Sequence, residues 1–225
     1  MTRKSSIDLG LNERQQQILL AVVKEAIQSK LSGKKLPKYD FEDKIFHEKR
    51  GAFVTLHKNS QLRGCIGYIV GIAPLLETIQ RMAIASAFED PRFPSLEKEE
   101  FKYLNIEISV LTLLKKVKDI SEIKIGRDGL LIKKGFYQGL LLPQVAEEEG
   151  WDVETFLKHT CLKAGLYPDA WKEKDASIEK FSAQIFAQNI GEILDIESIT
   201  NKFNSDSPFV PISSGLRRTG ISVRE

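Results

Sequence analysis

The sequence is poor in the residues that build metal centres and disulfide frameworks. Its 225 residues include two cysteines, Cys65 and Cys161, and three histidines. The histidines, His47, His57 and His159, are scattered and lack the paired spacing of zinc ligands, so no structural zinc site is expected, whereas a site completed by carboxylates stays open. Two cysteines in a chain of this size need no disulfide framework. Free thiols are typical of the reducing cytoplasm, where we expect the protein to act.

An excess of one charge sign is also lacking. The chain has 33 basic and 31 acidic residues, and its net charge of +2 does not favour nucleic-acid binding. A basic loop at Lys34, Lys35 and Lys38 is more typical of a solvated connection than of a nucleic-acid site. The longest apolar runs, such as residues 139–143, are far shorter than a membrane-spanning helix. The basic first residues are not followed by an apolar stretch, so neither a membrane segment nor a secretory signal is expected.

Three helices are predicted from their caps and from apolar residues at helical spacing. Asn12 and Gln15 have the spacing of a capping box, and Asp152 is a typical N-cap residue. A helix that begins at Pro74 must end before Pro91, because a proline ring disfavours helical geometry in the residue ahead of it. The expected helices span residues 12–33, 74–90 and 152–165.

Strands are predicted where apolar and polar residues alternate. The clearest is 104–110, in which Ile106, Ile108 and Val110 would face the core. Asn59-Ser60 forms a polar turn between two strands of a hairpin. The expected strands are 52–58, 61–69, 104–110 and 178–187, and two short hairpin-like pieces are marked by Gly129, Gly135 and Gly139.

These elements favour an α+β fold with a mostly antiparallel sheet and flanking helices. A doubly wound parallel fold is less favoured, since no Gly-rich strand-to-helix turn of the nucleotide type occurs. We expect one domain over residues 11–200. Residues 201–225 are rich in Ser, Pro and Gly without periodicity and are expected to form a flexible tail.

The segment 62–68 is the most informative part of the chain. In a regular strand its even-numbered residues, Leu62 among them, would face the core, and Arg63, Cys65 and Gly67 would share the other face. Glycines within a strand often mark a place where another backbone or a ligand comes close. A nearby arginine favours the thiolate form of a cysteine. The segment therefore predicts a small pocket with a glycine floor, a cationic anchor and a reactive or ligating sulfur.

Each of these residues also has a structural interpretation. Free cysteine often behaves as a small buried hydrophobe, and Arg63 would serve equally well in a salt bridge to a carboxylate. Cys161 lies in the apolar stripe of the predicted helix 152–165, so we assign it to the core. His57 precedes the hairpin turn and is interpreted either as a candidate general base for Cys65 or as a solvated hairpin end.

Two further places supply candidate ligand-binding residues. The loop from Asp90 to Pro94 is stiffened by its two prolines. Asp90 and Arg92 give it one charge of each sign, and Phe93 gives it an aromatic ring. It is interpreted as the wall of a pocket or as a helix stop in which Arg92 is bonded locally. Gln144 follows the end of a strand and begins a helix, where backbone N–H groups could meet an anion.

Together these segments resemble the AMMECR-type domain family. The string Leu-Arg-Gly-Cys-Ile-Gly at residues 62–67 is the family's hallmark, and it maps onto Arg63, Gly64 and Cys65. The resemblance covers roughly residues 11 to 195 and implies an α+β fold with a larger and a smaller lobe. It also implies companions among Memo-type and radical-SAM proteins, and it implies no established reaction. The supporting blocks are residues 51–56, 62–67, 90–94, 106–111, 139–146 and 150–171.

Two functions remain open at this point. The first is a small-ligand or catalytic cleft, in which Arg63 holds a carboxylate or phosphate, with help from Arg92, and Cys65 is the nucleophile or a ligating group. The second is a non-catalytic adaptor that works with a Memo-type or radical-SAM protein. The sequence assigns neither a reaction nor a cofactor.

Overall fold

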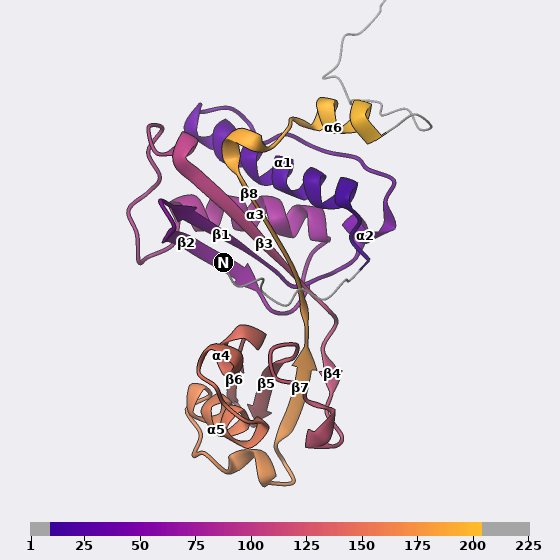
Figure 1. Ribbon diagram of the computed structural model, residues 1–225, viewed down its shortest axis with the longest axis vertical. Helices are drawn as coiled ribbons and strands as arrows, with labels where there is room; N and C mark the ends of the chain where they lie inside the picture. The colour runs from indigo at the N-terminus through magenta and orange to yellow at the C-terminus, as the bar shows by residue number, and fades with distance from the viewer. Residues whose placement is uncertain (1–9, 204–225) are drawn as a thin grey trace, which may run out of the picture.

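The strands form two antiparallel sheets, one above the other along the long axis of the molecule (Figure 1). The computed structural model describes residues 10–203. The first sheet has the strand order β2-β1-β3-β8, and the second has the order β4-β7-β5-β6. We call the first sheet with its helices the larger lobe and the second with its helices the smaller lobe. The prediction of an α+β fold with antiparallel sheets is confirmed.

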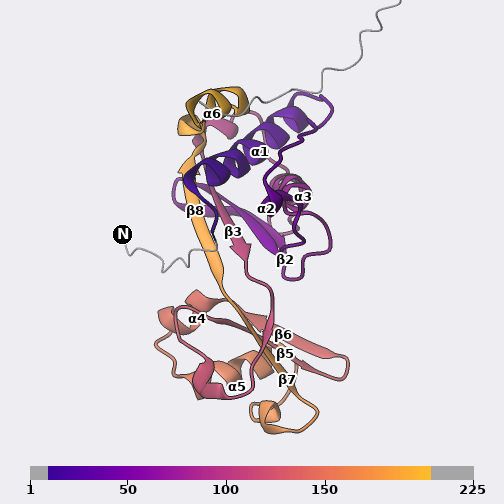
Figure 2. The ribbon, with the colours of Figure 1, turned by 90° about the vertical axis from the view of Figure 1, so that its right-hand side faces the viewer.

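The larger lobe contains both ends of the described chain. Its core forms where α1 and α3 cover one side of the first sheet (Figure 2). Its strands are β1 (Ala52–Lys58), β2 (Gln61–Tyr68), β3 (Leu104–Leu111) and β8 (Ala183–Asn189). Its helices are α1 (Glu13–Leu31), α2 (Lys44–His47), α3 (Leu75–Phe88) and α6 (Ile196–Phe203), with short 3-10 turns η1 (Phe101–Tyr103) and η4 (Ile190–Glu192).

The N-terminal cap of α1 forms as the sequence predicts. The Asn12 side chain accepts a hydrogen bond from the backbone N–H of Gln15 at 2.9 Å, and the Gln15 side chain accepts one from Asn12 at 3.1 Å. Two orphan donors of the first turn are thereby satisfied. Beyond the cap, the predicted apolar face is fully buried against α3 and the sheet.

The β1–β2 hairpin is confirmed, but its register departs from a regular ladder. Asn59 and Ser60 have φ of +52° and +64°, as a tight hairpin turn requires. Leu56 pairs with Gly64 and His57 pairs with Leu62, so β2 has one extra residue at position 63. The prediction that Leu62 faces the core is therefore wrong, and its side chain is 41% exposed.

The smaller lobe packs its second sheet against two helices. Its strands are β4 (Lys115–Lys116), β5 (Gly129–Lys134), β6 (Tyr137–Leu141) and β7 (Ser177–Phe181). Its helices are α4 (Pro143–Glu148) and α5 (Val153–Lys163), with short turns η2 (Ile120–Glu122) and η3 (Ala170–Lys172). The third predicted helix is confirmed, because Asp152 caps α5 and Gly165 follows it with φ of +77°. Of the two predicted hairpin-like pieces, only β5–β6 pairs locally, since β4 pairs with the distant β7.

The predicted strand over 178–187 is two strands that belong to different sheets. Ser182 separates β7 from β8, and the ribbon passes there from the smaller lobe into the larger one (Figure 2). Thr112 lies beside this joint, where the chain leaves β3. Its backbone N–H donates to the Ser182 carbonyl, and its hydroxyl accepts from the Ser182 N–H, both at 2.8 Å. A small cluster of Leu111, Phe181 and Ala183 packs at the same joint.

We expect Thr112→Val to lower the free energy of unfolding by about 1–3 kcal/mol, because it leaves the buried Ser182 N–H without an acceptor. Urea unfolding measures the change. The matched control is Thr112→Ser, which keeps the hydroxyl and should lose less than about 1 kcal/mol. Equal losses in the two variants would show that the hydroxyl does not hold the joint.

The end of α6 overlaps the predicted tail. Residues 201–203 belong to α6, whereas the rest of the predicted tail, residues 204–225, lies outside the described residues. Within residues 10–203, no helix is both long enough and apolar enough to span a bilayer.

Candidate functional site

The backbone of Cys65 is held on both sides by the loop that follows α3. The Cys65 N–H donates to Asp90 Oδ2 at 2.9 Å, and Arg92 Nη2 donates to the Cys65 carbonyl at 3.1 Å. Since β2 lies at the edge of the first sheet, these two side chains replace the hydrogen bonds of a missing neighbouring strand. We call this arrangement the Asp90–Arg92 clamp.

The clamp is internally paired as well. Arg92 donates to Asp90 through its backbone N–H at 3.1 Å, through Nε at 2.9 Å and through Nη2 at 2.7 Å. The side-chain hydrogen bonds from Arg92 hold the pKa of Asp90 far below its usual range, and the Cys65 N–H adds to the effect. Asp90 is only 4% exposed, so a permanently ionised carboxylate is buried against the edge of β2.

The Cys65 side chain points away from the helices of the larger lobe. Cys65 lies opposite Thr55, and the Thr55 hydroxyl donates to the Cys65 sulfur at 3.2 Å. Strand alternation places Thr55 on the side opposite Val54 and Leu56, which pack against the helices. We call the Thr55 side of the first sheet the open face. The Cys65 thiol lies on it, half-buried.

Both glycines of the segment 62–67 mark close approaches, and in each case the approaching group belongs to the protein itself. A Cβ at Gly64 would lie 2.0 Å from the carbonyl oxygen of Ser86 in α3. A Cβ at Gly67 would lie 2.3 Å from the Phe53 ring. The glycines therefore let α3 approach one side of β2 and an aromatic ring cover part of the other.

Arg63 has different partners from Cys65. Its Nε and Nη2 donate to the two carboxylate oxygens of Glu100 at 3.1 and 2.9 Å, and Lys58 joins the same carboxylate at 2.8 Å. Lys58 is on the Val54–Leu56 side of β1 by strand alternation, whereas Thr55 is on the other. The predicted sharing of one face by Arg63 and Cys65 is therefore wrong, because the extra residue in β2 turns Arg63 toward Glu100.

One guanidinium nitrogen of Arg63, Nη1, donates no hydrogen bond to any described residue. The side chain is 9% exposed, and its Nη1 is buried without a hydrogen-bond partner among the described residues. The other two nitrogens form the salt bridge that the sequence left as one of two alternatives. An anion or a water molecule is the kind of acceptor that such a buried donor requires.

We expect the Arg63–Glu100 pair to make stability depend on pH. The Arg63 guanidinium, with help from Lys58, lowers the pKa of Glu100 from 4.5 to about 2. A lowered pKa stabilises the fold above the unfolded value and loses this effect as pH falls from about 4.5 to about 2. In urea unfolding, the stability advantage of the native protein over Glu100→Gln should shrink by about 3 kcal/mol across that range. A constant difference would show that Glu100 does not ionise as a partner of Arg63.

The other candidate residues lie in different parts of the fold. His57 is on the open face, two residues beyond Thr55 in β1 and opposite Leu62. The Phe93 ring lies beside Arg92, whose guanidinium carbon is 5.4 Å from the ring centre. Gln144 is in α4 of the smaller lobe. The core assignment of Cys161 is confirmed, since it is fully buried and burial raises the pKa of its thiol.

Sequence reasoning missed two partners of the hallmark segment. Thr55 was placed only as an alternating strand residue, although its position opposite Cys65 follows from the hairpin register. Glu100 lies in the acidic stretch Glu97-Lys98-Glu99-Glu100, and no sequence pattern distinguishes its carboxylate from those of the neighbouring glutamates. Within residues 10–203, no group of three or more His, Cys, Asp or Glu side chains is placed to hold a metal ion.

The fold and the clamp define an α+β protein with two antiparallel sheets and a thiol fixed on an edge strand. The AMMECR1 family model matches residues 20–186, and the chain belongs to this family. It is 46% identical to Protein MJ0810 of Methanocaldococcus jannaschii over 75% of this chain and 89% of that protein. It is 50% identical to Protein TK0174 of Thermococcus kodakarensis over 63% and 74% of the two chains.

A solved relative has the same fold. The crystal structure of the uncharacterized protein PH0010 from Pyrococcus horikoshii matches with a TM-score of 0.68 and 43% identity. The match covers 76% of this chain and 90% of that chain. These relatives are uncharacterised, so the biochemical activity of the family member described here is unknown.

Proposed function

We propose that the open face around Cys65 is a small-ligand site in which the thiol contacts the ligand. The observation that carries the proposal is the Asp90–Arg92 clamp, which fixes the Cys65 peptide while its thiol remains on the open face. A site needs its contacting groups to be held in place by supporting residues. Here a buried carboxylate and an arginine provide that support for a single residue of an edge strand.

The groups around the thiol define what the ligand would meet. Thr55 donates to the sulfur, and Glu107 of β3 lies opposite Thr55 in the next strand. His57 is two residues from Thr55 on the same face and would be the general base if the site is catalytic. The Arg63 salt bridge lies on the other side of the sheet and supports the site only by fixing the end of β2.

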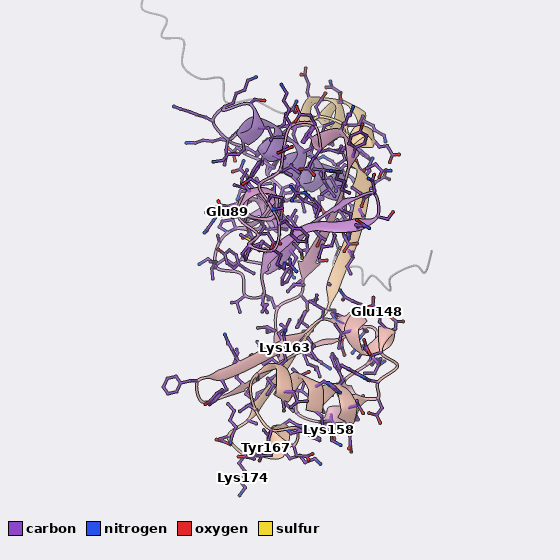
Figure 3. All side chains as sticks on the ribbon, turned by 90° about the vertical axis from the view of Figure 1, so that its left-hand side faces the viewer. Glu89, Glu148, Lys158, Lys163, Tyr167 and Lys174 are labelled. Atoms are coloured by element: carbon purple, nitrogen blue, oxygen red, sulfur yellow. The ribbon has the colours of Figure 1, made fainter. Side chains whose placement is uncertain are left out.

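Thiol–disulfide exchange with a library of disulfide-bearing fragments tests this proposal, since the Cys65 thiolate attacks one sulfur and releases the other as a thiol. In the Cys161→Ala variant, a ligand site beside Cys65 should select a few fragments well above the average extent of coupling. The matched control adds Cys65→Ala and Lys174→Cys, because Lys174 is exposed at the far end of the smaller lobe (Figure 3). The control thiol should couple to fragments without such selection. Identical fragment rankings at the two positions would reject a ligand site at Cys65.

A second candidate function is a protein-binding module for a Memo-type or radical-SAM protein. The residue that would contact the partner is Leu62 of β2, which is 41% exposed beside the Cys65 strand segment. Titration calorimetry with a purified Memo-type protein tests it. Leu62→Ser should weaken binding, whereas Leu194→Ser, at a residue 39% exposed elsewhere, should not. Equal affinities of both variants and the native protein would reject this role for Leu62.

We also propose that the protein acts in the cytoplasm. Cys65 and Cys161 are both free thiols, which persist in a reducing compartment.

A further inference from the structure

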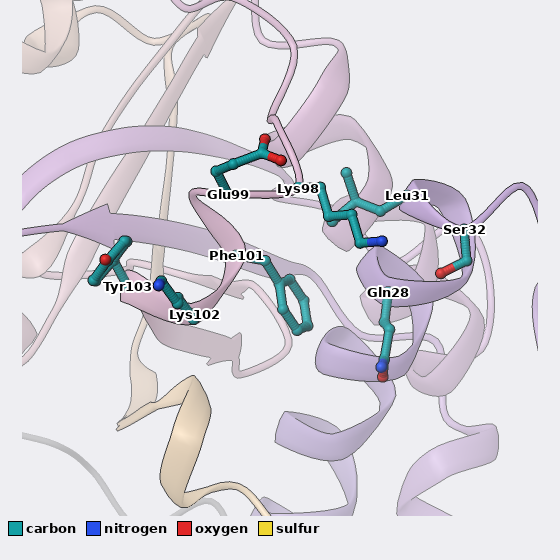
Figure 4. Close-up of a pocket in the computed structure, with 8 residues that line it drawn as sticks. All are labelled: Gln28, Leu31, Ser32, Lys98, Glu99, Phe101, Lys102 and Tyr103. Carbon is teal, nitrogen blue, oxygen red and sulfur yellow. The ribbon is translucent and has the colours of Figure 1, made fainter.

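The larger lobe contains a hollow that is separate from the open face. It has a volume of about 360 Å³ and lies between the C-terminal end of α1 and the segment Lys98–Tyr103 (Figure 4). No residue of β2 lines it. The hollow is therefore not the surface on which Cys65 lies, and a ligand there would be recognised by different groups.

The hollow is lined by both apolar and polar side chains. Leu31 from α1 and Phe101 from η1 form its apolar part, and both are half-buried. Figure 4 shows the Phe101 ring and the Lys98 ammonium group directed from their segment toward α1. Gln28 and Ser32 contribute an amide and a hydroxyl from the α1 side. The lining therefore offers an apolar surface at Leu31 and Phe101 together with polar groups, as small-molecule sites do.

The charge around the hollow is positive. Lys98 and Lys102 line it, and neither has a carboxylate within 4.0 Å among residues 10–203. Lys102 lies over the Tyr103 ring, 4.8 Å from its centre. Lys34, which follows Ser32 closely in the chain, adds charge at the end of α1. Glu99 is the only acidic side chain among the lining residues.

The neighbouring carboxylate does not cancel this charge. Glu100 lies between Glu99 and Phe101, but its side chain is held by Arg63 and Lys58. The two hydrogen bonds from Arg63 to Glu100 also hold the segment Lys98–Tyr103, which forms one wall of the hollow.

We propose that this hollow binds a small anionic amphiphile, meaning a ring system with one carboxylate, sulfonate or phosphate group. The ring packs against Leu31 and Phe101, and the anion lies by Lys98, whose ammonium group is directed toward α1 (Figure 4). The volume is at the lower end of the range of about 300–1,000 Å³ for small-molecule sites, which favours a small ligand over a peptide. Anions are attracted most where lysines lack competing carboxylates.

Fluorescence titration with two matched probes tests the proposal. Anilinonaphthalene sulfonate carries an aromatic frame and one anionic group, and phenylnaphthylamine carries the same frame without charge. The native protein should bind the sulfonate at one saturable site, and about tenfold more tightly than the neutral probe, a difference of about 1.4 kcal/mol. Equal affinity for the two probes would overturn the proposal, because the lysines would then contribute nothing.

Charge-reversal variants locate the site. Lys98→Glu with Lys102→Glu should weaken sulfonate binding about tenfold or more. Lys163→Glu with Lys174→Glu makes the same charge change in the smaller lobe (Figure 3) and should leave affinity within about twofold. Phe136→Ser removes a fully exposed ring elsewhere and should also have no effect. All four lysines are exposed, and matching thermal melts verify folding. Equal effects of the two charge variants, or loss of binding in Phe136→Ser, would overturn the assignment to this hollow.

Discussion

Gly64→Ala is expected to lower the free energy of unfolding by about 3 kcal/mol or more. The added Cβ would lie 2.0 Å from the Ser86 carbonyl oxygen, far inside van der Waals contact. Because that oxygen belongs to the backbone of α3, it cannot rotate away as the end of a flexible side chain does. The helix must move off β2, and the core between them opens. Urea unfolding monitored by circular dichroism measures the loss.

The matched control for this substitution is Gly191→Ala. Gly191 has no atom within 4 Å of the position of an added Cβ, so its substitution should change stability by less than about 1 kcal/mol. If Gly64→Ala were as mild as Gly191→Ala, the close approach of α3 to the hallmark segment would be contradicted.

Glu100→Ala is expected to lower the free energy of unfolding by about 3–5 kcal/mol. Its carboxylate binds Arg63 with both oxygens, and removing it leaves the guanidinium buried without a counter-ion. A buried unpaired charge costs more than the pair itself contributes. The Lys98–Tyr103 segment should also loosen, which hydrogen exchange at its backbone amides would show.

Two further variants separate this effect from a general loss of charge. Glu99→Ala removes an exposed neighbouring carboxylate and should cost less than about 0.5 kcal/mol. Replacing both partners, Arg63→Met with Glu100→Leu, should recover most of the stability lost in Glu100→Ala, since no unpaired charge remains. A double variant as unstable as Glu100→Ala would argue against a pairwise interaction.

Local patterns were sufficient for much of this fold. The capping box of Asn12 and Gln15 depends on residues three apart, and the hairpin turn at Asn59 and Ser60 depends on adjacent ones. Both form as the sequence predicts, because their hydrogen bonds and backbone angles are decided within a few residues. The buried positions of β3 follow from its alternation in the same way.

Features that depend on distant partners were not predictable. The extra residue at Arg63 is invisible in the alternating sequence, since a bulge is decided by the partner strand and by Glu100. The change from one sheet to the other occurs at Ser182, whose backbone N–H donates to the hydroxyl of Thr112, 70 residues away in the chain. Similarly, the pairing of β4 with β7 joins segments separated by α4 and α5.

The candidate site, too, was predictable only where nearby residues decide the structure. Cys65 was identified from its segment, and the Asp90–Arg92 loop was identified from its stiffness and charge. Their contact was not predictable, because the clamp joins a strand to a loop 25 residues further along the chain. Arg92 is bonded locally to Asp90, as one of the two sequence interpretations predicts, and it also binds the Cys65 carbonyl.

The most direct measurement is the alkylation of the folded protein with N-ethylmaleimide, with the modified cysteine identified by mass spectrometry. Because Cys65 lies half-buried on the open face and Cys161 is fully buried, we expect one equivalent to react at Cys65. Cys161 should react only after unfolding in denaturant. Failure of Cys65 to react until the protein unfolds would contradict the account, because the thiol would then be a packed core residue and the Asp90–Arg92 clamp would serve the architecture alone.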